Sequence, residues 1–282
     1  MIFEQLLEEN SMDYFGMIPD DCLFNIDREY VRGIVGQDNR TREMTAVIVW
    51  ELKNVESEKL PTEAEVLWFY AMDENSGGEI LKEFEKNLYV DEVHRTWFEM
   101  QELSNEEQAA LKAAGYSVTE TESIDLTFTC KELSSFNLLK RDPPDYIMSL
   151  SELTSREYRE GIMTTVFHGR YGLLDDLPFI PMSRFDPYIS SCVFLDDKVK
   201  GFLLVHEKKS GDFMPELFFA IEPDANLHLL QMLHFSVRSA VYYRAPEDTI
   251  IVRRHNDATK KLTAKLFPGK KGENVTWCEK EY

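Results

Sequence analysis

The strongest constraint on this sequence is an internal repeat. The segment EVLWFYAMDEN, Glu65–Asn75, aligns with ELFFAIEPDAN, Glu216–Asn226, at a constant offset of 151 residues. In both halves the alignment runs through a buried strand and a loop into a helix, and a further strand and helix follow in the same order. Agreement in the order of elements argues against a chance match, so the chain is predicted to contain two copies of one α/β unit.

Periodicity predicts the elements of the first copy. Residues 45–52 (TAVIVWEL) and 65–72 (EVLWFYAM) have the apolar character of buried strands. Apolar residues then recur at helical spacing in 79–88, which predicts a helix that begins after the loop 73–78. The remaining elements are predicted as a strand at 94–101, a helix opened by a Ser104–Glu107 capping box and ended by Gly115, and closing strands at 116–118 and 124–133.

Length, charge and proline content place the boundary between the copies. At about 150 residues per domain, a chain of 282 residues suggests two domains. Up to residue 136 the chain has 11 basic and 30 acidic residues, net −19, and the remainder has 20 basic and 21 acidic residues, net −1. The stretch SSFNLLKRDPPDY, at this change of charge, is typical of a linker. The predicted domains are residues 1–136 and 146–282, joined by a linker at 137–145.

Composition excludes several classes of partner and location. A net charge of −20 disfavours nucleic acid and anionic membranes and favours cationic partners, with a simply solvated acidic surface as the alternative. The apolar stretches are strand-sized, whereas a membrane span needs about 20 residues. The amino terminus lacks the basic head of a secretory signal, and four widely spaced cysteines without a CxxC pair suit reduced thiols. We therefore expect a cytoplasmic protein with no nucleic-acid or membrane partner.

The order of predicted elements resembles that of the GNAT superfamily of acyl-CoA N-acyltransferases, in both halves of the chain. AEVLWFYAM, followed by a glycine-containing loop and a helix, is similar to the family's fourth strand and pyrophosphate loop. ALKAAGYSV is similar to its last helix, which ends in glycine and an aromatic residue. The resemblance implies an α/β fold of two tandem domains, each a twisted mixed sheet flanked by helices.

The same resemblance implies a function and a set of site residues. The implied reaction is transfer of an acetyl or other acyl group from acyl-CoA to a small-molecule or peptide amine, for which the acidic first half favours a cationic acceptor. Helix-start amides attract the pyrophosphate, and the resemblance places acyl-CoA at Met72, Ser76, Gly77 and Gly78.

The general base of many relatives lies at the start of this strand, at Glu65 in the first copy and Glu216 in the second. The alternative for each is a solvated or ion-paired glutamate.

Both copies depart from the family pattern. In the first copy, Asp73 replaces a basic or amide residue and Ser76 replaces a glycine, whereas the second copy has no glycine in its loop. The tyrosine that many relatives use as general acid falls on Leu111 in one copy and Thr263 in the other. These losses leave open a second function, a catalytically degenerate tandem module that acts in binding or regulation.

The second copy carries a late cluster of basic residues, for which two roles stay open. The cluster could meet the phosphates of CoA, or it could face the acidic first copy in a contact between the domains. It comprises Arg253, Arg254, Lys260, Lys261, Lys265, Lys270 and Lys271. No pair of histidines has metal-binding spacing, and no GxSxG motif occurs, so neither a metal site nor hydrolase chemistry is predicted.

Overall fold

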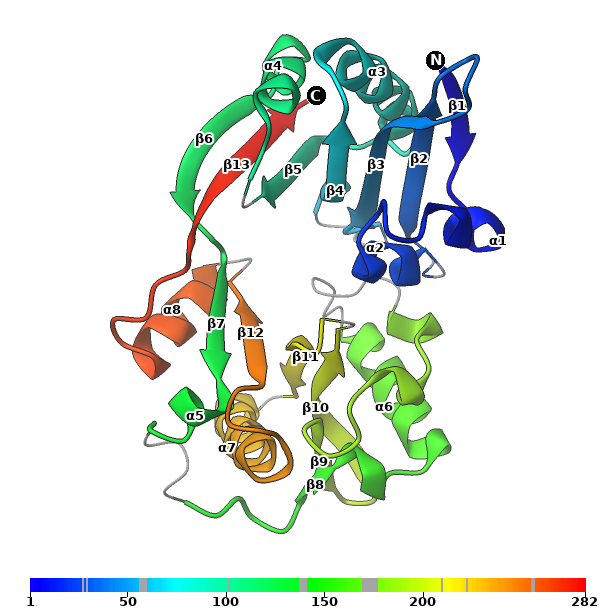
Figure 1. Cartoon of the computed structure of the whole chain (residues 1–282). Coiled ribbons are helices and arrows are strands. Elements are labelled where there is room, and N and C mark those ends of the chain that lie inside the picture. Colours follow the sequence, from blue (N-terminus) through cyan, green and yellow to red (C-terminus); the bar gives the residue numbers. More distant parts are fainter. Residues whose placement is uncertain are drawn as a thin grey trace. The chain divides into compact units, whose positions relative to one another are not determined.

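The chain forms two compact units, each with its own sheet and helices (Figure 1). A computed structural model describes the whole chain except residues 27, 29, 56–59, 101, 137–140, 169–176, 209, 222 and 255–256. Unit 1 comprises Met1–Ser123 and Asn274–Tyr282, and unit 2 comprises Ile124–Glu273.

Unit 1 is built on a seven-stranded mixed sheet. Its strands are β1 (Ile2–Gln5), β2 (Val31–Gln37), β3 (Met44–Lys53), β4 (Glu63–Ala71), β5 (Arg95–Met100), β6 (Ser117–Glu122) and β13 (Asn274–Glu281), in the order β1-β2-β3-β4-β5-β13-β6. Its helices are α1 (Glu8–Ser11), η1 (Met12–Tyr14), α2 (Asp20–Asn25), α3 (Glu74–Val90) and α4 (Asn105–Ala113). The strands predicted at 45–52 and 65–72 are confirmed as β3 and β4.

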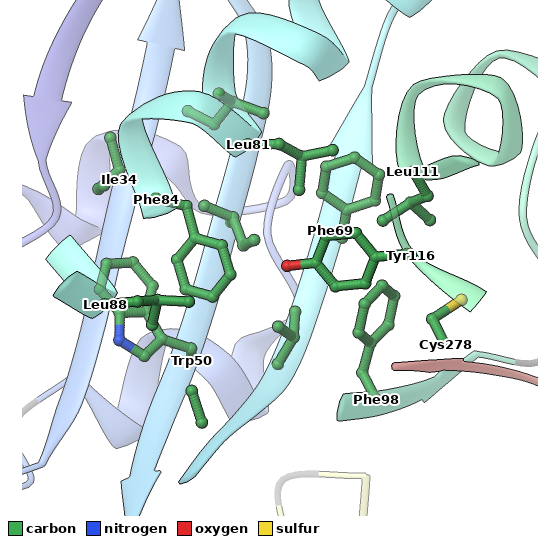
Figure 2. Packing of buried hydrophobic residues seen from close by; sticks show 14 of the residues in the cluster. Ile34, Trp50, Phe69, Leu81, Phe84, Leu88, Phe98, Leu111, Tyr116 and Cys278 are labelled. Carbon is green, nitrogen blue, oxygen red and sulfur yellow. The ribbon is translucent and has the colours of Figure 1, made fainter. Parts of the chain in front are cut away.

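Helices cover both faces of this sheet. On one face α3 and α4 enclose an aromatic core, in which the ring of Phe84 meets Trp50 edge to face at 4.8 Å (Figure 2). On the other face, Ile18 and Leu23 from the α1–α2 region pack on Val47 and Val49 of β3. Burial on both faces explains why β3 is a nearly continuous apolar run rather than an alternating one.

Unit 2 is built on a six-stranded mixed sheet. Its strands are β7 (Asp125–Thr129), β8 (Ile147–Ser149), β9 (Ser191–Leu195), β10 (Lys198–Glu207), β11 (Phe213–Ala220) and β12 (Thr249–Arg253), in the order β7-β12-β11-β10-β9-β8. Its helices are α5 (Cys130–Leu133), α6 (Ser155–Phe167), α7 (Ala225–Tyr243) and α8 (Asp257–Leu266), with short turns η3 (Leu150–Glu152), η4 (Leu177–Phe179) and η5 (Met182–Arg184). α6 and α7 pack on opposite faces of the sheet.

The two halves of the sequence exchange their last strands. The segment 124–133, expected to close the first copy, forms β7 and α5 and pairs with β12 in unit 2. In return β13, from the end of the second copy, lies between β5 and β6 in unit 1. The predicted linker at 137–145, of which 137–140 lie outside the described residues, is therefore within the range of unit 2. Strand alternation marks which side chains are buried but does not say which sheet a strand joins.

All four cysteines are buried and free. Among the helices that the structure describes, none combines the length and the apolar character that a membrane span requires.

Candidate functional site

In each unit, two parallel strands pair briefly and then part. β4 pairs with β5 only over Glu63–Glu65, although β4 continues to Ala71. β11 pairs with β12 at a single position, Phe213 with Ile250, although β11 continues to Ala220. Beyond these positions the structure describes no pairing between the facing strand edges, so their backbone groups can bind partners other than each other.

A β-bulge on the longer strand marks the same place in both units. Leu67 is the extra residue of β4 opposite β3, and Glu216 is the extra residue of β11 opposite β10. The bulges are 149 residues apart, whereas the helix caps Asp73 and Asp224 are 151 apart. The loop of unit 2 is therefore two residues longer, and Glu216 is the structural counterpart of Leu67 rather than of Glu65.

Glu65 lies in a buried network of ion pairs. Its side chain, in a residue only 6% exposed, lies 3.4 Å from Lys53 Nζ. Lys53 also contacts Glu51 at 2.7 Å, and Arg28 contacts Glu51 at 3.0 Å. Burial lowers the pKa of Lys53, but Glu51 and Glu65 outweigh it and raise the pKa above the ordinary lysine value. Glu65 thus has the ion pair that the alternative to a catalytic role assumed.

Glu216 has a different partner, which the sequence did not point to. Its Oε1 lies 2.6 Å from Nδ1 of His206, and the two side chains are 13% and 11% exposed. His206 follows Phe202 and Leu204 on the face of β10 that packs against α6. The spacing of the two residues along the chain does not indicate this contact, because it depends on how β10 and β11 pair.

The predicted pyrophosphate cradle of unit 1 is the first turn of a helix. α3 begins at Glu74, five residues before the predicted start, because Asp73 caps it. Asp73 Oδ1 accepts a hydrogen bond from the Ser76 amide at 2.8 Å, and the Asp73 carbonyl accepts one from the Gly77 amide at 3.0 Å. Gly78 lies inside the helix, and Met72 is 58% exposed just before the cap. Of the amides expected to meet phosphate, that of Ser76 is thus bound by the Asp73 side chain, and that of Gly77 makes a regular helical hydrogen bond.

Gly77 has a packing role. A Cβ built on Gly77 would lie 2.6 Å from the Ala110 Cβ of α4 and 3.1 Å from the Ala71 Cβ of β4. At Gly78, by contrast, a Cβ would meet nothing within 4 Å. The absence of a side chain at Gly77 therefore allows α3 to pack directly on α4.

A buried carboxylate joins α4 to the end of β4. Glu107 Oε1 accepts a hydrogen bond from the Ala71 amide at 3.2 Å, and Oε2 accepts one from the Ser104 amide at 2.8 Å. The second contact belongs to the predicted Ser104–Glu107 capping box, which is confirmed. The hydrogen bond from the Ala71 amide to Glu107 uses a backbone donor of β4 in the stretch where β4 and β5 are no longer paired.

The arrangement of these elements is shared with solved structures, although no protein-family model matches the sequence and no curated protein matches it at a significant level. A tandem GNAT protein from the clavulanic acid biosynthesis pathway is similar with a TM-score of 0.57 and 11% identity, over 99% of this chain and 98% of that chain. This chain has the tandem GNAT fold.

Two further structures agree. A GCN5-related N-acetyltransferase from Kribbella flavida has a TM-score of 0.52 and 11% identity, over 99% of this chain and 71% of that one. A conserved protein of unknown function from Enterococcus faecalis has a TM-score of 0.53 and 10% identity, over 99% of this chain and 72% of that one. The predicted fold class, two tandem GNAT-like domains with mixed sheets, is confirmed, and at these identities the similarity concerns the fold.

The two units differ at the start of the helix that follows the parted strands. In unit 1, the Asp73 side chain accepts a hydrogen bond from the Ser76 amide, Glu107 accepts one from the Ala71 amide, and Gly77 packs against Ala110. In unit 2, Asp224 makes no side-chain hydrogen bond to the start of α7.

Unit 2 has no counterpart of Glu107 or Gly77 at the equivalent helix positions. The third residue of α8 is Thr259, where α4 has Glu107. The fourth residue of α7 is His228, where α3 has Gly77. Unit 2 therefore repeats neither the carboxylate that joins α4 to β4 nor the glycine that allows α4 to pack on α3.

Part of the basic cluster is engaged within unit 2. Arg253 Nε lies 3.0 Å from Asp125 Oδ1, and Lys270 Nζ lies 2.9 Å from Glu132 Oε1. Both carboxylates come from the segment 124–133 that unit 2 receives from the first half of the sequence. Lys260, Lys261 and Lys265 on α8 are exposed.

The two residues that take the place of the family tyrosine, Leu111 and Thr263, are both buried. Leu111 is part of the core beneath α3 and α4, and Thr263 is buried on α8, where its hydroxyl donates to the Thr259 carbonyl at 2.8 Å. Among the residues that the structure describes, no group of three or more potential metal ligands lies together.

Proposed function

We propose that this protein is an acyl-CoA-dependent N-acyltransferase in which unit 2 binds the acyl-CoA. The observation that carries this proposal is the contrast at the helix that follows the parted strands. α7 begins without a side-chain cap, whereas in α3 the side chain of Asp73 binds the amide of Ser76. Unpaired amides at a helix start attract phosphate, and carboxylates there repel it. The start of α3 has two carboxylates, Asp73 and Glu74, whereas the start of α7 has Asp224 and no acidic residue in its first turn.

Different parts of unit 2 bind the cofactor and take part in the reaction. The amides at the start of α7, at Ala225 and the two residues after it, bind the pyrophosphate. The edge of β11 that faces β12 binds the pantetheine arm by its backbone groups. Acyl-CoA supplies an activated thioester, which an amine converts into an amide with release of the thiol. Glu216, at the bulge of β11, takes part in removing the proton of the amine, together with its partner His206.

Unit 1 has a supporting role in this proposal. Its Asp73, Glu107 and Gly77 close the place that would hold a second acyl-CoA, so one unit is competent and the other is not. The acceptor is an amine, and the acidic charge of the chain favours a cationic one inside the cell. The alternative function is a module without catalysis that acts in binding or regulation. Only the contacts of Asp73, Glu107 and Gly77 in unit 1 favour it.

Titration calorimetry with acetyl-CoA tests the proposal, and a matched pair of variants assigns the unit. Asn226 and Asn75 are both exposed second residues of their helices. An acidic residue at this position suits the helix dipole and should not unfold either unit. We expect Asn226→Glu to weaken acetyl-CoA binding about tenfold or more by charge repulsion, and Asn75→Glu to leave it unchanged.

Two results would contradict the proposal at different levels. The absence of both binding heat and thermal shift with acetyl-CoA would exclude the acyltransferase function. Binding that is weakened by Asn75→Glu and not by Asn226→Glu would keep the function but move the cofactor to unit 1. Release of the CoA thiol in the presence of a panel of amines, with a diamine among them, then tests turnover and the preference for a cationic acceptor.

A further inference from the structure

The contact between His206 and Glu216 joins two neighbouring strands at the bulge of unit 2. His206 Nδ1 and Glu216 Oε1 lie 2.6 Å apart, close enough for a charge-assisted hydrogen bond. Glu216 is the bulged residue of β11, skipped in the backbone register with β10. The bulge therefore turns its side chain onto the face of the sheet that carries His206. Both side chains are largely buried there, which favours a single fixed geometry.

This contact determines which nitrogen of the histidine carries the proton. An ionised carboxylate only accepts hydrogen bonds, so Nδ1 of His206 must be the donor. In the neutral imidazole, Nε2 then has a lone pair and accepts a proton. Among the described residues, Nε2 has no hydrogen-bond partner.

Unit 1 has no equivalent arrangement. The position of His206 in β10 corresponds to that of Glu51 in β3. Each is the second residue after the register shift at the bulge. Glu51 is bound by Lys53 and Arg28, two cations that keep their protons. A side chain with a ring nitrogen that can accept a proton therefore stands at this position in unit 2 and not in unit 1.

We propose that His206 is the general base of the reaction and that Glu216 is the residue that positions it. The inference rests on the proposed acyltransferase function and replaces a direct role of Glu216 in proton removal. As the amine nitrogen forms its bond to the acyl carbon and the carbon–sulfur bond breaks, Nε2 of His206 takes the proton of the amine. The Glu216 carboxylate stabilises the resulting imidazolium, and the proton then passes to the released thiolate or to water.

Kinetics of three variants test this assignment. We expect His206→Ala to lower kcat by about 10²–10⁴-fold with acetyl-CoA affinity unchanged, and added imidazole to restore part of the activity. Glu216→Gln should retain more activity than His206→Ala, because the amide oxygen can still accept the Nδ1 hydrogen bond. His168→Ala, at an exposed histidine after α6, serves as the control and should behave as wild type.

The outcomes separate the inference from the function on which it rests. Wild-type turnover that survives His206→Ala, or that is lost in Glu216→Gln but not in His206→Ala, would overturn the inference and leave the function standing. Absence of wild-type turnover with every amine would overturn both.

Nitrogen-15 NMR of His206 adds a readout that needs no turnover. The neutral ring should be protonated at Nδ1, and a neutral ring protonated at Nε2 would contradict the inference, since that nitrogen could not accept a proton.

Discussion

The α-carbon of Gly77 in α3 faces Ala110 in α4 so closely that a Cβ at Gly77 would lie 2.6 Å from the Ala110 Cβ. Side chains do not approach at this distance, so two helices that follow successive strands are packed together where the strands of unit 1 have parted. This contact explains the glycine of the predicted phosphate loop by packing.

Substitution of Gly77 tests that explanation. Gly77→Ala should lower the free energy of unfolding by about 1–3 kcal/mol, because the new methyl group forces α3 away from α4 and β4. Gly78→Ala is the matched control: a Cβ meets nothing there, and alanine is the better helix former by about 0.5–1 kcal/mol, so this variant should be neutral or more stable. Urea denaturation measures both, and equal effects of the two variants would refute the packing role.

The Glu107 carboxylate should matter for stability as well. Glu107→Ala leaves the buried amide of Ala71 without its acceptor, which should cost about 1–3 kcal/mol. Glu106→Ala, on the exposed side of the same helix turn, should stay within about 0.5 kcal/mol of wild type. Thermal unfolding distinguishes them, and a wild-type melting temperature for Glu107→Ala would count against a buried bridge to β4.

Lys53 should be one of the most sensitive charged residues of unit 1. Lys53→Met removes the cation that contacts both Glu51 and Glu65, and breaking a buried ion pair costs about 3–5 kcal/mol. Lys82→Met, at an exposed position of α3, is the control and should change little. If chemical denaturation shows similar curves for both variants, the network around Glu65 is not a structural one.

The exchanged strands predict that neither half of the chain folds alone. A fragment of residues 1–136 lacks β13, which brings the buried Cys278 and the 2.5 Å contact of Lys280 with Glu85 to unit 1. A fragment of residues 137–282 lacks β7, the neighbour of β12. We expect poorly dispersed NMR spectra for each fragment and recovery of the folded spectrum on mixing. A cooperative melt of either fragment by itself would contradict the exchange.

Buried thiols predict both reactivity and alkaline behaviour. Burial raises the pKa of Cys192 and of Cys278 to about 12, from an ordinary value of 9.0. Their thiols should resist a disulfide reagent at pH 8 until the protein is unfolded. Because the native state keeps protons that the unfolded state releases, their contribution to stability is fully present below about pH 9 and is lost as the pH rises toward 12. Stability that increases over this range would contradict the burial of these groups.

Much of the fold follows from local patterns in the sequence. The apolar runs of β3 and β4, the helical spacing within α3 and the Ser104–Glu107 capping box all lie within short segments, where side-chain type and backbone conformation are coupled directly. The repeat of these elements predicts two GNAT-like units because the same local rules apply twice. The start of α3 was predicted too late, since glycines usually favour a loop, whereas Asp73 caps the helix before them.

The partners of these elements were decided by the tertiary structure. Any strand with one buried face can join any sheet through the same backbone groups, so the sequence did not distinguish the exchange of β7 and β13 from two separate domains. The site depends on contacts of the same kind: Glu65 with Lys53, and Glu216 with His206. These side chains are brought together by a bulge and by strand register, which no spacing along the chain specifies. The sequence by itself therefore determined the repeated scaffold, and long-range packing determined which carboxylate is held by a cation and which lies beside a histidine.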